Sequence, residues 1–249
     1  MDPGARFAHA AIKELPRLVD RAMNQTKLGI TREEFLASIR RSLSPATGSA
    51  LRDPLPAPSN EILRITRHEE DLPAVFTRHA IAMGMKVHRS TVDSLGTTIQ
   101  SLLTSLDAKR IVLDIPAYPI ANLIRNAISD GRKIIDPAKA RNLDVQFDCD
   151  VGITSVFAAI AETGTLVIAS DMHRSRGTFL IPPVHIAVIF ESHILPDMID
   201  LWPVTLRGVH PALTLVTGPS KTADIEGILI TGVHGPKAVH VIVLENPKD

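Results

Sequence analysis

From residue 61 onward, helical patterns alternate with short apolar runs, and this alternation restricts the chain to few folds. The helices are predicted over 68–83, 91–106 and 120–131, with Gly131 as a C-cap, and the strands over 85–88, 110–114 and 133–135. Strand–helix–strand units of this spacing favour a largely parallel sheet with helices on both faces. The sequence therefore predicts an α/β fold of three layers.

The second half of the chain is expected to add strands to this sheet. Residues 151–170 read as a short helix, a turn at Thr163-Gly164 and a buried strand over 166–169. Further strands are predicted at 185–190, 212–217 and 239–244. Their near-continuous apolar runs indicate burial on both faces of the sheet.

The first 60 residues differ in character from the rest. Residues 1–43 form a predicted helical extension, in which Thr31 and Glu34 make a capping box. Residues 44–60 contain four prolines and read as a linker, because such a segment holds neither a helix nor a central strand. The α/β domain is then expected over 61–249, and residues 1–30 are expected to serve homo-oligomerisation or partner docking.

The charge balance and the apolar pattern exclude several classes of function. Lys and Arg total 27, as do Asp and Glu, so no basic field is available to attract nucleic acid. The start of the chain lacks the apolar run of a signal peptide, and no run approaches the roughly 18 apolar residues of a membrane span. We therefore expect a cytoplasmic protein. The ten histidines show no metal-ligand spacing, so no metal site is predicted.

Cys149 is the only cysteine in the chain. One cysteine forms no disulfide framework and holds no iron–sulfur cluster, which takes about four cysteine ligands. The neighbours Asp148 and Asp150 would raise the pKa of the thiol, which disfavours a nucleophile and favours a buried, structural cysteine. No cofactor-binding motif is recognised, so the cofactor is unknown at this stage.

The most polar loop, "GPSKTADIEGILITGVHGP", joins two predicted strands. A helix is expected to begin near Thr222, and its N-terminus would favour an anion, with Ser220 and Lys221 as further donors. In the other interpretation Thr222 only caps this helix, and Asp224 and Glu226 complement its dipole. The residues alone leave both interpretations open.

Three further stretches carry side chains with chemical functions. In "AETGT", Glu162 is a base, a nucleophile or an anchor for a backbone amide. His234 lies between two glycines and is a general acid/base or a turn histidine. Arg176 lies on a polar loop, where it either binds a carboxylate or is solvated. His185 begins a strand, either as a hydrogen-bonded core histidine or as a ligand contact.

Taken together, "AETGTLVIAS", "LIPPVHIAVI" and "GPSKTADIEGILITGVHGP" resemble the signature of the LUD-domain family, in its lactate-utilization branch. The resemblance runs in order over residues 150–245. It implies a fold akin to the sugar-phosphate isomerase, CoA-transferase and formyltetrahydrofolate cyclo-ligase group. It also implies a role in oxidising L-lactate to pyruvate, with partner subunits that are cysteine-rich and carry iron–sulfur clusters. Lys221 departs from the arginine that is common in the family, which turns a bidentate anion contact into a point charge.

The resemblance joins these stretches into one candidate site. Its candidate catalytic residues are Glu162 and His234. Its candidate ligand-binding residues are Thr163, Gly164, Thr165, Arg176, His185, Gly218, Ser220, Lys221, Thr222, Asp224, Glu226 and Gly235. The leading hypothesis is a soluble subunit of a lactate utilization system that binds a small anionic ligand in a cleft between these stretches. The alternatives are a stand-alone enzyme on a phosphorylated, acyl-CoA or folate-type metabolite, and a non-catalytic assembly or regulatory module.

Overall fold

The computed structural model describes most of the chain after residue 63 and one helix before it. The described residues are 32–43, 64–116, 120–128, 131–136, 143–171, 174–205, 211–225 and 228–246. The chain divides into two units, Met1–Pro58 and Ser59–Asp249, and each is described by itself.

Helix α2 (Arg32–Leu43) belongs to the first unit and lies within residues 1–43, which are predicted to be a helical extension. Glu33 and Glu34 lie in its first turn and Arg40 and Arg41 in its last turn, which complements the helix dipole. Phe35 and Ile39, one helical turn apart, are exposed. The rest of the extension and the proline-rich segment 44–60 lie outside the described residues.

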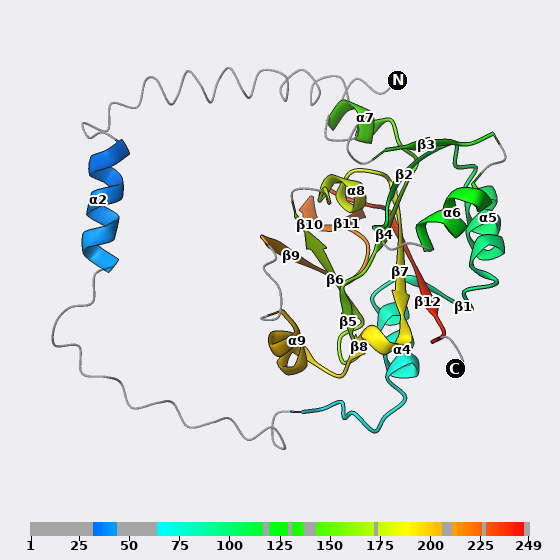
Figure 1. Ribbon diagram of the computed structural model, residues 1–249, viewed down its shortest axis with the longest axis horizontal. Coiled ribbons are helices and arrows are strands. Elements are labelled where there is room, and N and C mark those ends of the chain that lie inside the picture. The colour runs from blue at the N-terminus through cyan, green and yellow to red at the C-terminus, as the bar shows by residue number, and fades with distance from the viewer. Residues whose placement is uncertain are drawn as a thin grey trace. The chain divides into compact units, whose positions relative to one another are not determined.

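Six parallel strands form the central sheet of the second unit (Figure 1). In the order in which they pair, they are β1 (Lys86–Ser90), β12 (Ala238–Leu244), β7 (Val184–Phe190), β4 (Val151–Ser155), β2 (Arg110–Asp114) and β3 (Lys133–Ile135). Every pairing is parallel. The four inner strands are buried along most of their length, which explains their apolar runs. The predicted α/β fold with a mostly parallel sheet is confirmed.

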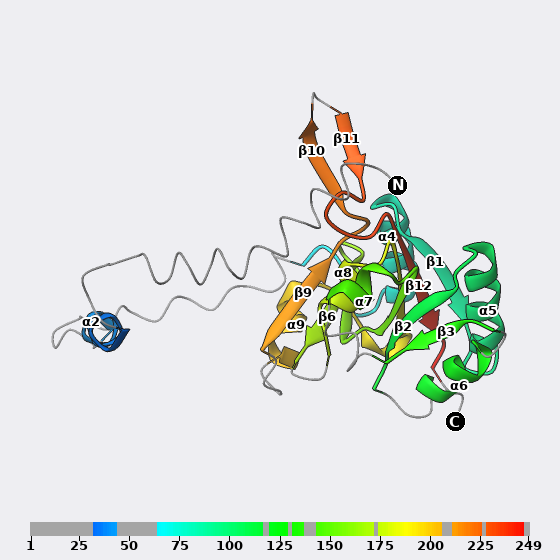
Figure 2. The ribbon, with the colours of Figure 1, turned by 90° about the horizontal axis from the view of Figure 1, so that it is seen from above.

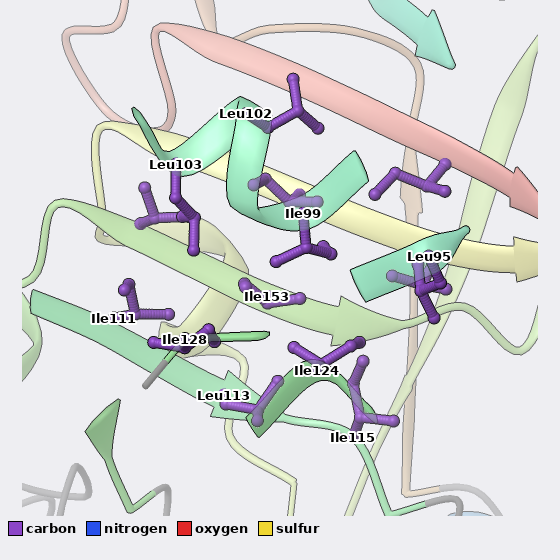
Figure 3. Packing of buried hydrophobic residues seen from close by; sticks show 14 of the residues in the cluster. Leu95, Ile99, Leu102, Leu103, Ile111, Leu113, Ile115, Ile124, Ile128 and Ile153 are labelled. Atoms are coloured by element: carbon purple, nitrogen blue, oxygen red, sulfur yellow. The ribbon is translucent and has the colours of Figure 1, made fainter. Parts of the chain in front are cut away.

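Helices α5 (Leu95–Ser105) and α6 (Ile120–Ala127) cover one face of this sheet (Figure 1). Leu95, Ile99 and Leu103 follow one another at a spacing of four residues, so they lie on one face of α5. Figure 3 shows these side chains packed toward the isoleucines and leucines of β2 and β4. The apolar face of α5 thus closes the larger core of the domain.

Helix α4 (Leu72–Ala82) covers part of the opposite face, together with a second sheet. The side chain of Asp71 caps α4 by accepting the Ala74 N–H over 3.1 Å, and Pro73 occupies the first turn. Two short helices, α7 (Leu143–Phe147) and α8 (Gly177–Leu180), complete the domain, and α8 packs on β4 and β7.

The second sheet was not foreseen in the sequence. Its strands, in pairing order, are β8 (Ile194–Leu195), β5 (Ala158–Ile160), β6 (Thr165–Ser170) and β9 (Ala212–Val216). The short helix predicted within 151–170 is therefore wrong, because this segment runs through β4 and β5. The spacing of a continuous apolar run does not separate a buried helix from a buried strand. The β-branched residues of this run favour the strand.

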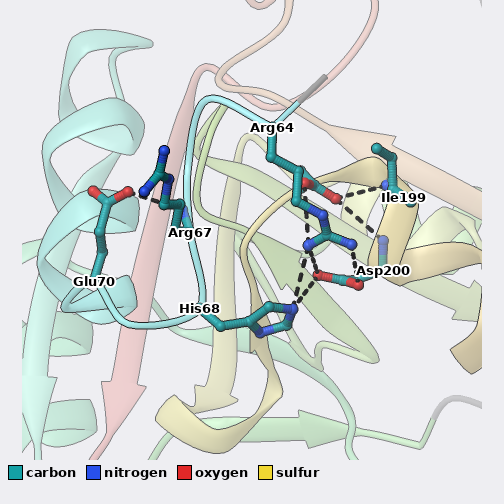
Figure 4. A network of polar contacts seen from close by, with 7 residues as sticks. Arg64, Arg67, His68, Glu70, Ile199 and Asp200 are labelled. Atoms are coloured by element: carbon teal, nitrogen blue, oxygen red, sulfur yellow. Dashed lines mark hydrogen bonds and ion pairs between the residues drawn. The ribbon is translucent and has the colours of Figure 1, made fainter. Parts of the chain in front are cut away.

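A cluster of charged side chains joins the segment before α4 to helix α9 (Met198–Thr205) (Figure 4). Arg64 donates to both carboxylate oxygens of Asp200, over 2.6 and 2.8 Å, which lowers the pKa of that carboxyl. Asp197, 3.5 Å from the same guanidinium, accepts the backbone N–H groups of Ile199 and Asp200 and so caps α9. Arg64 thus holds the first turn of α9 against the segment that precedes α4.

The surroundings of Cys149 and the apolar character of the helices bear on two expectations drawn from the composition. Cys149 is buried, its Sγ–H donates to the Val145 carbonyl over 3.2 Å, and burial raises the pKa of the thiol. These properties suit a structural cysteine. Of the helices within the described ranges, none has both the length and the apolar composition that a membrane crossing requires.

We predict that Gly152→Ala destabilises the domain by about 2–3 kcal/mol, a typical cost of overpacking. A Cβ on Gly152 would overlap the backbone carbonyl of Thr178 in α8, so β4 and α8 would have to separate. Gly96→Ala is the matched control, because its Cβ would lie 3.5 Å from the Ala127 Cβ, an ordinary contact. In a helix this change is neutral or stabilises by up to ~1 kcal/mol. Urea unfolding of both variants checks the difference, and equal midpoints would contradict it.

Candidate functional site

The polar stretches singled out in the sequence meet at the amino end of the central sheet. Pro183 immediately precedes β7, and its carbonyl accepts the N–H groups of Lys237 and Ala238, over 2.8 and 3.3 Å, where β12 begins. The Pro236 carbonyl accepts the Ser220 N–H over 3.0 Å. Backbone hydrogen bonds therefore hold "PPVH", "VHGP" and the start of "SKT" together.

The "AETGT" turn is fixed by α4 and by the segment after β8. The Ala161 carbonyl lies 2.9 Å from Nδ1 of His79, which must donate because a carbonyl only accepts. The Glu162 N–H donates to the Pro196 carbonyl over 3.0 Å. Gly164 has a φ of +63°, and a Cβ there would overlap the backbone of α4. Only glycine fits this position without rearrangement.

A chain of three hydroxyls connects this turn to the end of β9. The Oγ1 atoms of Thr163 and Thr165 are 2.7 Å apart, and those of Thr165 and Thr217 are 2.9 Å apart. Thr165 is buried, whereas Thr163 and Thr217 are exposed. Three hydroxyls have three hydrogens, and two contacts use two of them. One O–H therefore remains to donate outside the chain of hydroxyls.

Two glycines bring the neighbouring backbone close to this group. Gly218 has a φ of +120°, and a Cβ there would lie 2.6 Å from the carbonyl oxygen of Met83 at the end of α4. A Cβ on Gly235 would lie 3.0 Å from the Cβ of Ser220. The loop that follows β9 is thus packed against both α4 and the "VHGP" stretch.

The helix predicted to begin near Thr222 is wrong. Strands β10 (Lys221–Ile225) and β11 (Ile228–Thr231) pair antiparallel in this region, and Figure 2 shows their hairpin projecting from the domain. The acidic residues that suggested a first helical turn belong to a segment rich in isoleucine and threonine, which favours strands.

Because this segment is a strand and not a helix, an anion could not be held by a helix N-terminus here. The Ser220 N–H is used by Pro236, and the Gly232 N–H donates to the Ser220 carbonyl over 2.8 Å. Because these two amides are occupied and no helix begins in the described part of the loop, the helix-terminus argument fails. The side chains of Ser220, Lys221 and Thr222 remain as donors.

The region that contains both sheets and these stretches matches a known family. The LUD domain family matches residues 73–244. The chain belongs to the LUD domain family. The resemblance that the motifs suggested is thereby confirmed.

Several relatives carry the name lactate utilization protein C. The one from Halalkalibacterium halodurans is 26% identical over 227 residues, which cover 86% of this chain and 98% of that protein. The one from Exiguobacterium sp. is 29% identical over 227 residues, which cover 86% and 96%. The one from Macrococcus caseolyticus is 37% identical over 118 residues, but these cover 44% of this chain and only 51% of that protein. The last match thus spans about half of the relative's length.

A solved structure has a similar fold. The crystal structure of a DUF162 family protein from Deinococcus radiodurans superposes with a TM-score of 0.55 at 20% identity, covering 70% of this chain and 96% of that chain. This similarity supports the α/β architecture of the LUD domain. The relation to the isomerase and transferase group stays a prediction.

Within the LUD domain, the predicted site residues fall into three sets. The structure brings together Thr163, Gly164, Thr165, Gly218, Ser220 and Gly235. Lys221 and His234 are exposed, and Glu162 is half-buried. Asp224 lies in β10, but its side chain is outside the described part of the chain, as is the whole of Glu226. Among the described residues, no three His, Cys, Asp or Glu side chains converge as metal ligands.

His185 lies in β7 and contacts a different set of residues. Its Nε2 is 2.9 Å from Thr154 Oγ1, and its Nδ1 is buried with no hydrogen-bond partner in the described structure. An unpartnered lone pair costs less than an unpartnered N–H, so Nε2–H donates to Thr154. Burial lowers the pKa of His185 to about 3, so the ring is neutral at physiological pH.

Asp114, the last residue of β2, is a buried carboxyl that the sequence reading overlooked. Burial raises its pKa to about 6, and Thr178 donates a weak hydrogen bond to it over 3.4 Å. Because open α/β sheets bind ligands beyond the carboxyl ends of their strands, the position of Asp114 at the end of "RIVLD" was a usable signal. Arg176 lies near this end, where it lines a depression with Ser170 and Arg174.

We predict that the free energy of unfolding falls as the pH drops below about 6.5, the ordinary pKa of histidine. Between about 6.5 and 3, unfolded His185 binds a proton that the folded state excludes, so stability is lost by up to ~1.4 kcal/mol per pH unit. His240, with a pKa lowered to about 4, acts in the same direction. Asp114 acts in the opposite direction, because its raised pKa lets the folded state bind protons more tightly than the unfolded state between about 3.8 and 6.

Urea unfolding at pH 7.5 and pH 5 measures this loss. His185→Gln removes one of the two histidines named above and should lose less stability between these pH values than the unaltered chain. Thr97→Val, which changes an exposed residue that does not titrate, should keep the original pH dependence. Equal losses in the unaltered chain and the His185 variant would contradict the assignment.

Proposed function

We propose that this chain is a subunit of a system that oxidises L-lactate to pyruvate and that it binds a small carboxylate ligand. The names of the relatives aligned over 86% of the chain support the metabolic role. The chain has a single cysteine, so iron–sulfur and cysteine-rich partner subunits are proposed to carry the electrons.

The observation that carries the ligand site is the hydroxyl chain Thr163–Thr165–Thr217. Its uncommitted O–H lies at a point where three separate stretches of the chain converge, and the threonines at both ends, Thr163 and Thr217, are exposed residues. A carboxylate accepts such hydrogen bonds, and charge assistance makes them stronger than neutral ones. Ser220 and Lys221 follow on the same segment and are proposed to supply a second hydroxyl and a positive charge.

Glu162 and His234 are the proposed proton-transfer groups of this site. Oxidation of lactate removes one proton from its hydroxyl group, so a base must lie near the bound ligand. The Glu162 backbone is held by Pro196 next to the hydroxyl chain, which limits where its carboxylate can reach. His234 lies on the exposed "VHGP" loop, next to Gly235 and therefore close to Ser220.

We predict that Thr165→Val weakens binding of L-lactate and pyruvate about fivefold, the effect of losing one hydrogen bond of ~1 kcal/mol. The change keeps the β-branched shape of the side chain and breaks both contacts of the hydroxyl chain. Isothermal titration calorimetry measures the two affinities. Thr97→Val, on the exposed side of α5, is the control and should bind as the unaltered chain does. Unchanged affinity in the Thr165 variant would remove the hydroxyl chain from the site.

We predict that Glu162→Gln abolishes lactate-dependent dye reduction in the assembled system while lactate affinity changes by less than about threefold. The amide keeps the size of the side chain but cannot accept a proton at neutral pH. The measurement compares extracts that lack the chain, restored with either form of it. Full restoration by the glutamine form would exclude Glu162 as the base. If extracts that lack the chain already reduce the dye with lactate at the full rate, the proposed role in lactate oxidation is contradicted.

A further inference from the structure

A cavity of about 390 Å³ lies at the carboxyl end of the central sheet. It is lined where β4 ends at Ser155, where β7 ends at Phe190 and where β2 leads into Ile115. Open α/β sheets bind their ligands beyond this end of the strands. The volume also falls in the range of roughly 300–1,000 Å³ that is typical of small-molecule sites. The hydroxyl chain of the proposed lactate site lies at the amino end, so the cavity is a separate feature.

The walls of this cavity are mostly apolar. Aromatic and aliphatic surface comes from Val188 and Phe190 in β7, from Ile120 at the start of α6 and from Phe157 between β4 and β5. An aliphatic or aromatic body gains free energy by leaving water for such walls. L-Lactate has only one methyl group to place there, so the cavity suits a larger molecule.

Arg174 supplies a charged group at the wall of the cavity. Its Nε and Nη2 contact one oxygen of Asp171, over 2.8 and 2.7 Å, so one edge of the guanidinium is held in place. A guanidinium has five N–H donors in a fixed fork, and its Nη1–Nη2 edge is a second bidentate site. That edge matches the two oxygens of a carboxylate.

A small pocket beside the cavity, separate from the depression that Arg176 lines, contains an unpartnered polar group. Arg174 lines both the cavity and this small pocket, and Ser170 lines the small pocket together with Asp114. Ser170 is 6% exposed, and its hydroxyl has no hydrogen-bond partner in the described structure. A buried hydroxyl without a partner is costly, and a polar ligand atom would satisfy it.

We propose that this cavity binds an aliphatic or aromatic monocarboxylate larger than lactate. Its carboxylate lies on the Nη1–Nη2 edge of Arg174, and its hydrocarbon body packs between Phe157, Val188 and Phe190. Asp171 is a positioning residue, because it orients the guanidinium without contacting the ligand.

Octanoate is the probe, and the full chain is titrated with it by calorimetry. Octanoate should bind, 1-octanol should bind at least ~10-fold more weakly because it lacks the charge-assisted hydrogen bonds, and L-lactate should not displace octanoate. Arg174→Gln should weaken octanoate binding at least ~10-fold for the same reason. Arg78→Gln, which changes an exposed arginine of α4 outside the cavity lining, is the control and should leave the affinity unchanged.

A second variant keeps the proposal testable if the Arg174 variant does not fold. Val204 is half-buried in α9 and lines the cavity, so Val204→Phe narrows it without touching the arginine. This variant should also weaken octanoate binding. The proposal is overturned if octanoate does not bind, if 1-octanol binds as tightly as octanoate, or if L-lactate displaces octanoate. It is also overturned if a folded Arg174 or Val204 variant binds octanoate with unchanged affinity. The lactate measurements on Thr165→Val are independent of these outcomes.

The pH dependence of octanoate binding gives a further readout. Asp114 lines the same small pocket as Arg174, and Asp171 and His193 are the other titratable groups near the site. An ionised Asp114 repels a bound carboxylate, and burial raises its pKa to about 6. Octanoate should therefore bind more tightly at pH 5.5 than at pH 8. Asp114→Asn should reduce this difference more than His193→Gln does, and the reverse order would contradict the role of Asp114.

Discussion

The pairing of β12 between β1 and β7 holds the LUD domain together, because β1 has no other partner in the described sheet. β12 pairs with β1 over five residues and with β7 over seven, and its buried valines and isoleucines contribute to both cores. The contacts with β1 join residues such as Lys86 and His240, which lie 154 positions apart in the chain (240 − 86). Closing such a long loop lowers the conformational entropy of the chain. The free energy gained by burying the apolar side chains of β12 must offset this loss, so the burial must be extensive.

The same pairing builds the amino-end site. Where β12 and β7 begin side by side, the Pro183 carbonyl accepts two N–H groups from the start of β12, and this contact sets the position of the "VHGP" loop. Pro236 in turn holds Ser220, and Gly218 packs on the end of α4. Residues that are far apart in sequence therefore become neighbours as a result of strand register, and a shift in that register would separate them.

The sequence predicted the parallel sheet and the family well, because both depend on signals that are local and ordered along the chain. It failed where one pattern fits two structures. The apolar run after Val151 suits a buried helix as well as a buried strand. The acidic residues Asp224 and Glu226 suggested a first helical turn, whereas Lys221–Ile225 is a strand. Asp114 stands at the end of a predicted strand, which was a usable signal, but its burial and raised pKa depend on residues distant in the sequence.

The strand order also has a consequence for how the domain is made. On the ribosome β12 is synthesised after every other strand of the central sheet, yet it occupies the position between β1 and β7. Until β12 emerges, β7 presents an unpaired apolar edge, and the core under α4 lacks the three valines that β12 contributes. The nascent chain is thus an incomplete sheet with an open slot, a state that favours association with other strands and with chaperones. Release from this vulnerable state depends on one segment of seven residues.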